Sequence, residues 1–391
     1  MLILVANLGS TSFKYRLFRM EEAGAEVVAQ GGYERVEDHA EVISDALGTL
    51  QQDGIISSPN EIDAVGFKTV LGKDLSGCVI ADQQTIEALE GFAEVAPAHN
   101  PPYANGIRQF SKALPKAQLV ALFETAFYQW IPEASINYAI PKAWRDIGIR
   151  RYGFHGASHK FIAERSAELL GRDDVAAASR RLYLDGPAEL DSAPLRVVSC
   201  HLGGSSSVTG IRNGVAIGTS MGFSPQSGLP QNNRVGDLDS GALPYAMRKL
   251  GISLEEAERQ LTKESGLQGL SSISNDIRDI CEAADGGNSD ARLTLDSLIH
   301  SIRHWIGAYM LELGGIDALV FTAGIGENNR DLREAVCQGL EPFGIQIDSD
   351  KNQACRAVEA DISADGSSAK VFVIPANEEL VLAREVHRKL A

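Results

Sequence analysis

The stretch that decides the fold is Leu2-Ile3-Leu4-Val5-Ala6-Asn7-Leu8-Gly9-Ser10-Thr11-Ser12-Phe13-Lys14-Tyr15. Residues 2–8 form an apolar run of strand length, and residues 13–17 alternate apolar and basic side chains, as a half-buried strand does. Between them, Gly9 lets the backbone turn closely, and its neighbours offer N–H groups, hydroxyls and a positive charge that suit an anion. The side chains concerned are Ser10, Thr11, Ser12 and Lys14. The stretch therefore predicts a strand, a phosphate-binding turn and a second strand.

The same pattern returns in the middle of the chain. Residues 196–208 align with residues 2–14 without gaps, which places His201 on Asn7 and Gly203 on Gly9. Either turn alone has an ordinary hairpin as its alternative interpretation. Two matched turns half a chain apart instead favour phosphate binding and predict an α/β fold made of two duplicated domains that share a cleft.

The length of the chain predicts two domains, and its net charge excludes some classes of binding partner. The chain has 391 residues, of which 44% are apolar, and single cores rarely grow past roughly 250 to 300 residues. Its formal net charge is −16. We therefore expect neither nucleic acid nor an anionic membrane as a partner, and any anionic ligand requires cations gathered locally.

The cysteines and the hydropathy of the chain indicate the cellular compartment in which we expect the protein. The five cysteines form no CxxC pair, and an odd number fits reduced thiols better than a disulfide framework. No apolar run reaches the roughly 18 residues that a membrane span needs, and the opening residues follow a strand pattern rather than that of a signal peptide. We expect a soluble cytoplasmic protein.

Two further apolar runs each end next to residues that are candidates for binding a ligand. Residues 118–123 predict a buried strand that ends at Glu124, which is a candidate metal ligand or, alternatively, an N-cap or first-turn acid for the segment 126–130. Residues 318–321 predict another strand, followed by the turn Gly324-Ile325-Gly326 before a helix from about Arg330. Glycines at a strand-to-helix turn permit a nucleotide to approach the backbone.

Several histidines and arginines are candidates for binding an anion. Residues 150–159 hold two arginines, two glycines and two histidines before a predicted helix at 160–170, and this favours an anion patch over helix capping. His99 lies in a proline-rich segment, 96–102, predicted as a rigid loop, and is either a surface histidine or a site residue. Arg234 lies in a long irregular loop and has a planar guanidinium group suited to phosphate or carboxylate.

Residues 171–194 show no clear period of apolar residues, and we expect them to form a polar insertion or surface excursion.

Taken together, these motifs identify a family resemblance. The chain resembles the acetate kinase family, which includes acetate and propionate kinases, nearly from end to end. The segments that carry the resemblance are residues 7–14, 98–102, 152–159, 200–203, 219–223, 228–229, 274–279, 322–328 and 375–379, with Arg234 and Gly236-Asp237.

The resemblance implies a fold and an activity. The fold is two actin-like, ribonuclease H-like domains with an active-site cleft between them, at residues 1–150 and 151–377, with the C-terminal helix 378–391 joining the first. The activity is reversible, magnesium-dependent transfer of the ATP γ-phosphoryl group to a short-chain carboxylate, giving an acyl phosphate and ADP by direct in-line transfer. The resemblance also implies a homodimer, formed through the second domain.

It assigns site residues as well. Asn7 and Glu378 belong to the Mg²⁺ site by resemblance, and His155 and Arg234 hold the transferring phosphoryl group with His99 and His159 nearby. The acyl pocket is implied at Lys68, Val70, Leu122, Phe154 and Pro225. Nucleotide contacts are implied at Ser10, Ser12, Lys14, His201, Gly203, Gly204, Asp276, Ile277, Arg278, Gly324, Ile325, Gly326 and Asn328.

The chain departs from the family at the reacting groups. Lys68, Glu124 and Gly204 stand where the family usually has arginine, aspartate and asparagine, Leu71 and Tyr128 replace usual histidines, and Gln231-Asn232-Asn233 is atypical. These changes motivate two alternatives to a carboxylate kinase: a non-catalytic nucleotide-binding or regulatory relative, and a kinase with another acceptor or another donor, such as pyrophosphate.

Overall fold

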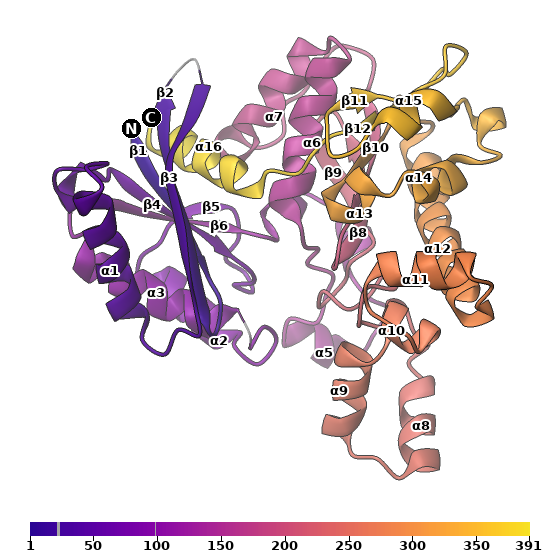
Figure 1. Ribbon diagram of the computed structural model, residues 1–391, viewed down its shortest axis with the longest axis horizontal. Helices are drawn as coiled ribbons and strands as arrows, with labels where there is room; N and C mark the ends of the chain where they lie inside the picture. The colour runs from indigo at the N-terminus through magenta and orange to yellow at the C-terminus, as the bar shows by residue number, and fades with distance from the viewer. Residues whose placement is uncertain (22–23, 98) are drawn as a thin grey trace.

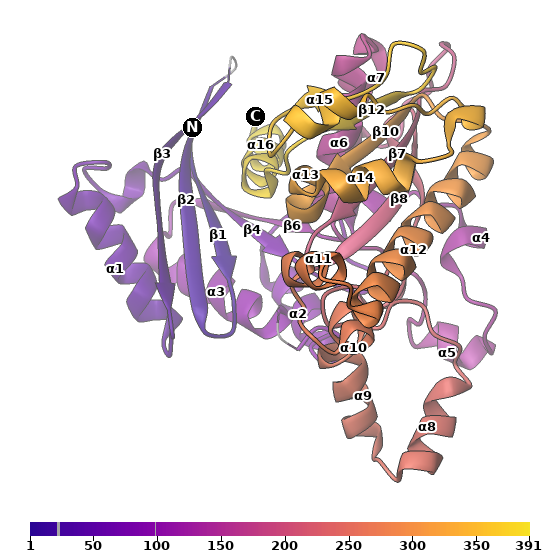
Figure 2. The ribbon, with the colours of Figure 1, turned by 45° about the vertical axis from the view of Figure 1, so that its right-hand side comes forward.

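The computed structural model describes residues 1–21, 24–97 and 99–391. It contains two six-stranded sheets, which lie side by side with helices α16 and α6 between them (Figures 1 and 2). The first sheet consists of β1 (Leu2–Leu8), β2 (Ser12–Glu21), β3 (Gly24–Glu34), β4 (Ala64–Thr69), β5 (Cys78–Ile80) and β6 (Gln118–Phe123). The second consists of β7 (Arg196–Leu202), β8 (Ser206–Arg212), β9 (Val215–Thr219), β10 (Ala318–Thr322), β11 (Ala360–Asp361) and β12 (Lys370–Val373).

The two sheets have the same topology. The strand orders are β3-β2-β1-β4-β6-β5 and β9-β8-β7-β10-β12-β11, so each strand of one sheet has a counterpart in the other. In both, the first strand pairs antiparallel with the hairpin partner and parallel with the next strand. This confirms the duplicated α/β fold predicted from the alignment of residues 2–14 with residues 196–208, and the fold is that of two actin-like units.

Helices cover both faces of each sheet. Around the first sheet lie α1 (His39–Gln52), α2 (Gln83–Gly91), α3 (Asn100–Ala113) and the returning C-terminal helix α16 (Glu378–Leu390). The short helices α4 (Glu133–Ile136) and α5 (Lys142–Asp146) lead to α6 (Gly156–Leu169) and α7 (Asp173–Asp185). Then follow α8 (Ala242–Leu250), α9 (Leu254–Lys263), α10 (Gly266–Ser271), α11 (Ile277–Asp285), α12 (Ser289–Leu313), α13 (Ala323–Asn328), α14 (Arg330–Cys337) and α15 (Ser349–Ala354).

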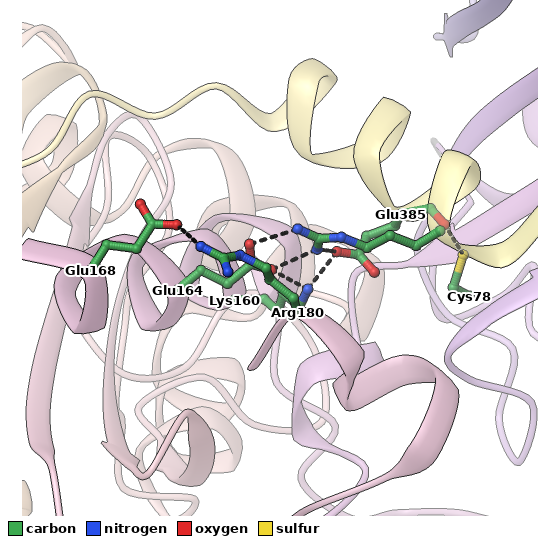
Figure 3. A network of polar contacts seen from close by, with 7 residues as sticks. Cys78, Lys160, Glu164, Glu168, Arg180 and Glu385 are labelled. Atoms are coloured by element: carbon green, nitrogen blue, oxygen red, sulfur yellow. Dashed lines mark hydrogen bonds and ion pairs between the residues drawn. The ribbon is translucent and has the colours of Figure 1, made fainter. Parts of the chain in front are cut away.

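Helix α16 returns the end of the chain to the first sheet. Gly66 makes the close approach possible, because a Cβ there would lie 2.9 Å from Val386 Cγ2. On its other side, α16 meets α6 through buried ion pairs (Figure 3): Lys160 contacts Glu164 and Glu385. The predicted boundary at residue 150 stays a prediction, and these two helices pack against each other between the two sheets.

Two local predictions were wrong. Residues 171–194 are not an irregular excursion, because Asp173–Asp185 forms α7, whose buried face is made of Val175, Ala176, Ser179 and Leu182. Small and polar side chains on that face hid its helical period. The proline-rich segment is only partly a loop, since Asn100 begins α3. Pro101 and Pro102 lie in the first turn of that helix, where a backbone N–H has no partner within the helix and its loss costs no hydrogen bond. Ala98, in the same segment, lies outside the described residues.

Each unit has its own buried apolar core, and all five cysteines are free thiols, as predicted. Among the described residues, the helices include none that is long and apolar enough to cross a membrane.

Candidate active site

Three charged side chains from three elements meet at one edge of the first sheet. Lys68 near the end of β4, Glu124 just after β6 and Glu378 at the start of α16 form an ion triad. The Lys68 ammonium lies 3.0 Å from Glu124 Oε1 and also bonds the Glu378 carboxylate. Parallel strands β4 and β6 end at the same edge, and this brings residues 56 positions apart together.

Glu124 is the most unusual member of the triad. Its side chain is only 7% exposed, and neither carboxylate oxygen receives a hydrogen bond from the described residues. Burial raises the pKa of Glu124 although Lys68 opposes that change. Burial also disfavours the charged forms of Lys68 and Glu378, but their mutual attraction dominates, so that the pKa of Lys68 is raised and that of Glu378 lowered. Glu124 does not cap a helix, because Thr125 occupies the N-cap of the following short turn.

Three histidines form a second cluster at the edge of the second sheet. His155 precedes α6 in a left-handed conformation (φ 62°) and stacks on His201 with ring centroids 4.1 Å apart. Ser207 Oγ lies 2.8 Å from both His155 Nδ1 and His159 Nε2, and His159 Nδ1 lies 2.8 Å from Ser199 Oγ. The predicted polar segment 150–159 therefore folds its histidines inward onto β7 and β8.

These histidines are held neutral. Burial, reinforced by their mutual repulsion, places the pKa values of His155 and His159 well below 6.5, and burial lowers that of His201 to about 4. A neutral imidazole retains one N–H donor, so the cluster offers hydrogen bonds to an anion without adding a full charge. The arginines of the same segment lie elsewhere: Arg150 and Arg151 each stack on a tyrosine, 4.8 Å from the ring centroid.

Arg234 is held by its own loop. Its Nη1 donates to Ser205 Oγ at 3.3 Å, to Gln231 Oε1 at 3.3 Å and to Pro225 O at 3.4 Å, and burial lowers its pKa. Only one nitrogen of the fork is engaged among the described residues, which leaves the rest of the guanidinium for a ligand.

His99 is the N-cap residue of α3 in the first unit, and its side chain makes no capping hydrogen bond. Its pKa is lowered by burial and then by the positive charges of Arg234 and Lys68.

A cavity of about 710 Å³ opens in the second unit. The sequence-predicted nucleotide residues that line it are Gly203, Gly204, Asp276, Ile277, Arg278, Gly324, Ile325 and Asn328. Gly326 is buried behind the cavity instead. Sequence reasoning missed Asn232, Cys281, Asn329, Arg330, Asp331 and Arg356, which also line it. The predicted turn Gly324-Ile325-Gly326 is part of the short helix α13, so the prediction of a turn there was wrong. Arg330 and Asp331 begin the helix predicted from about Arg330 and could have been found from that, whereas Cys281 and Arg356 carry no local signal.

The opening turn is built as predicted, but one residue departs from it. Gly9 N donates to Ser12 O at 2.9 Å, and a Cβ on Gly9 would lie 2.6 Å from Ser12 Oγ, so a side chain there would displace the Ser12 hydroxyl. Asn7 is exposed at the end of β1 and accepts a hydrogen bond from Tyr103 at 3.3 Å. Lys14 instead pairs with Glu34 on the β2–β3 surface at 3.0 Å, so the structure does not bring Lys14 to the site. Ser10 lies exposed in the turn.

The predicted acyl pocket is gathered only in part. Val70 and Phe154 pack in one apolar cluster with Leu71, Tyr152 and Met221. Leu122 is buried in the core of the first unit, where it pairs in register with Lys68. Pro225 contributes its carbonyl to Arg234 and Gln231.

The donors fit a hard divalent cation. Within the described parts of the chain there is no group of three or more His, Cys, Asp and Glu side chains placed to hold a metal. Asn7, Glu124 and Glu378 nevertheless offer oxygen atoms, and Glu124 Oε2 is buried without a hydrogen-bond partner among the described residues, while Oε1 faces Lys68. Mg²⁺ commonly takes one or two protein oxygens and completes its shell with water and phosphates.

Comparison with known proteins agrees with this geometry. The sequence profile of the Acetokinase family matches residues 29–384. The chain is 38% identical to an acetate kinase of Heliobacterium modesticaldum, over 100% of both chains. Among solved structures, it is similar to Porphyromonas gingivalis acetate kinase (TM-score 0.90, 34% identity, 100% of both chains) and to a propionate kinase from Francisella tularensis (TM-score 0.84, 30% identity, 98% of both chains).

Proposed function

The chain belongs to the Acetokinase family, and we propose that it transfers the γ-phosphoryl group of ATP reversibly to acetate or propionate, giving an acyl phosphate and ADP. The observation that carries this proposal is the continuity between the large cavity and the charged groups. A Cβ on Gly203, in the cavity wall, would lie 3.9 Å from His201 Nε2 and 3.6 Å from Ala323 Cβ. His201 in turn stacks on His155, and the charges of Lys68 and Glu378 act on it.

The reaction demands positioning more than proton transfer. A carboxylate oxygen of the acid forms a bond to the γ-phosphorus while the bond from that phosphorus to the bridging oxygen of ADP breaks, and no proton moves. Two anions must therefore be held in line while the charge on the three equatorial oxygens is stabilised. Arg234 supplies a fork for those oxygens, the neutral imidazole of His155 supplies a donor, and Lys68 supplies a cation beside the acid.

We assign Asn7, Glu124 and Glu378 as the groups that hold Mg²⁺, in part through water. When bound, Mg²⁺ neutralises charge on the nucleotide phosphates. Val70 and Phe154 line the place for the short acyl tail, since their cluster lies beside the strand end that carries Lys68.

The test is the direct detection of acyl phosphate. The purified chain, ATP and Mg²⁺ are incubated with formate, acetate, propionate or butyrate, and hydroxylamine traps any acyl phosphate as a hydroxamate. We expect turnover of acetate or propionate, and a loss of about 100-fold or more in kcat/KM for Arg234→Ala. Arg248→Ala, an exposed arginine on α8, is the matched control and keeps full activity. Nucleotide binding without turnover of any of the four acids would contradict the proposal.

We also propose a cytoplasmic homodimer. Five free thiols fit a reducing compartment, and ATP is found there. No observation favours the non-catalytic alternative, and the similar proteins that the comparisons find are acetate and propionate kinases. A cavity large enough for an adenosine argues against pyrophosphate as the donor.

A further inference from the structure

The loop that carries Arg234 is fixed onto the second glycine turn by backbone hydrogen bonds. Asn232 N donates to Gly204 O at 3.2 Å, and Asn232 O accepts from Gln268 N at 2.9 Å. Next to it, Ser205 Oγ donates to Gln231 Oε1 at 2.8 Å. Since both backbone groups of Asn232 are engaged, its side chain is held in place before any ligand arrives.

The Asn232 side chain lies next to Gly204 and fills space that a side chain at position 204 would otherwise need. A Cβ on Gly204 would be 3.3 Å from Asn232 Nδ2 and 3.7 Å from its Cγ, so a longer side chain at 204 would compete with the amide for the same space. Asn232 lines the 710 Å³ cavity, is half-buried and makes no side-chain hydrogen bond to the parts of the chain that the structure describes. It is therefore an amide donor that faces a cavity and lacks a partner.

We infer that the Asn232 amide donates a hydrogen bond to the phosphate chain of the bound nucleotide. This inference rests on the proposed function, in which the nucleotide occupies this cavity. In the Gly203-Gly204 turn, Gly203 lies close both to Ala323 at the start of α13 and to His201, since a Cβ on Gly203 would be 3.6 Å from Ala323 Cβ and 3.9 Å from His201 Nε2. A nucleotide that reaches from Asp276 and Gly324 to the histidine cluster thus has to pass this turn with its phosphates.

Two residues of the same loop then contact different parts of the nucleotide. Asn232 holds the phosphate chain from the side, and Arg234, two residues later, acts at the transferring group. The missing side chain at Gly204 is replaced from outside the turn, so the two positions are functionally coupled.

Calorimetric titration with ATP, ADP and adenosine tests the contact. Asn232→Ala should weaken ADP and ATP binding by about tenfold or more, as for a hydrogen bond to a charged group, and should leave adenosine binding unchanged. Asn232→Asp should weaken ADP and ATP binding further, because a carboxylate only accepts hydrogen bonds and repels phosphate. Asn233→Ala, next in the chain, is the matched control with unchanged affinities. Wild-type affinity of Asn232→Ala for ADP, or an equal loss for adenosine, would overturn the inference.

A double variant tests the coupling. Gly204→Asn combined with Asn232→Ala places a new amide in the vacated space and should restore most of the ADP affinity, whereas Gly204→Asn alone crowds Asn232 and weakens binding. A double variant no better than Asn232→Ala would refute the inference, provided that its thermal unfolding matches the wild type. If the wild type binds ADP but phosphorylates no acid, the proposed function fails while the affinities still decide the role of Asn232.

Discussion

The pair formed by Lys68 and Glu124 depends on the lengths of both side chains. Its members approach to 3.0 Å in a buried setting. Arginine at 68 is longer and forked, and aspartate at 124 is one methylene shorter, so changing one member misplaces the pair, whereas changing both preserves the combined length. We predict that Lys68→Arg and Glu124→Asp each lower kcat/KM for the acid about tenfold and that the double variant recovers most of this loss. Steady-state kinetics of all three variants measure the coupling, and simply additive losses would contradict it.

The buried histidines make stability depend on pH. His201 has a folded pKa of about 4, below the roughly 6.5 of an unfolded histidine, so the unfolded state binds more protons between these values. Stability is therefore full above about pH 6.5 and falls as the pH drops toward 4, by up to about 3 kcal/mol for this residue. Urea unfolding at pH 7, 6 and 5 measures the loss. His201→Gln should flatten the dependence, and His300→Gln, at an exposed position, should leave it unchanged.

Among the elements, the contact between α6 and α16 has a distinctive ionic core. The Lys160 side chain is 0% exposed and contacts Glu164 and Glu385, and Arg388 Nη1 bonds the same two acids (Figure 3). Lys160→Met removes one cation and leaves buried carboxylate charge unbalanced, which typically costs about 3 to 5 kcal/mol. Denaturant unfolding should show this loss. Lys142→Met, which removes an exposed pair with Asp146, should change stability by less than about 0.5 kcal/mol, and equal losses for the two would contradict the prediction.

Local patterns were sufficient for the long apolar strands but not for the short strands β5 and β11 or for every helix. The strands β1 and β7 were found because each is an apolar run that enters a glycine turn, and their alignment gave the duplication. Helix α7 was missed because its inner face is built partly from Ala176 and Ser179, whose small side chains are buried only once α6 packs on them. The outward direction of the Lys14 side chain could have been predicted. Phe13 and Tyr15 are buried, and side chains alternate between the two faces of a strand, so Lys14 points outward. By contrast, Asn232 meets Gly204 only through the tertiary fold.

At the scale of the whole molecule, the arm formed by α8 and α9 exposes several large apolar side chains. It projects from the second unit at the bottom of the view (Figures 1 and 2), and α8 contributes no buried residue. Tyr245 is 59% exposed, Leu250 67% and Leu254 48%. Exposed large apolar side chains on a projecting arm are typical of an interface, and a two-fold axis would let the arms of two copies cover each other.

We therefore predict that this arm forms the homodimer. Tyr245→Asp combined with Leu250→Asp places two charges on the shared surface, and burying them unpaired would cost several kcal/mol, enough to separate the copies at micromolar concentration. Sedimentation equilibrium should give a dimer for the wild type and a monomer of unchanged circular dichroism for the variant. Phe343→Asp, at an apolar residue 63% exposed outside the arm, should stay dimeric. A wild-type monomer, or a variant that remains dimeric, would mean that the arm serves another purpose. Because the predicted catalytic residues lie on strand ends and loops away from α8, a folded monomeric variant should retain carboxylate phosphorylation.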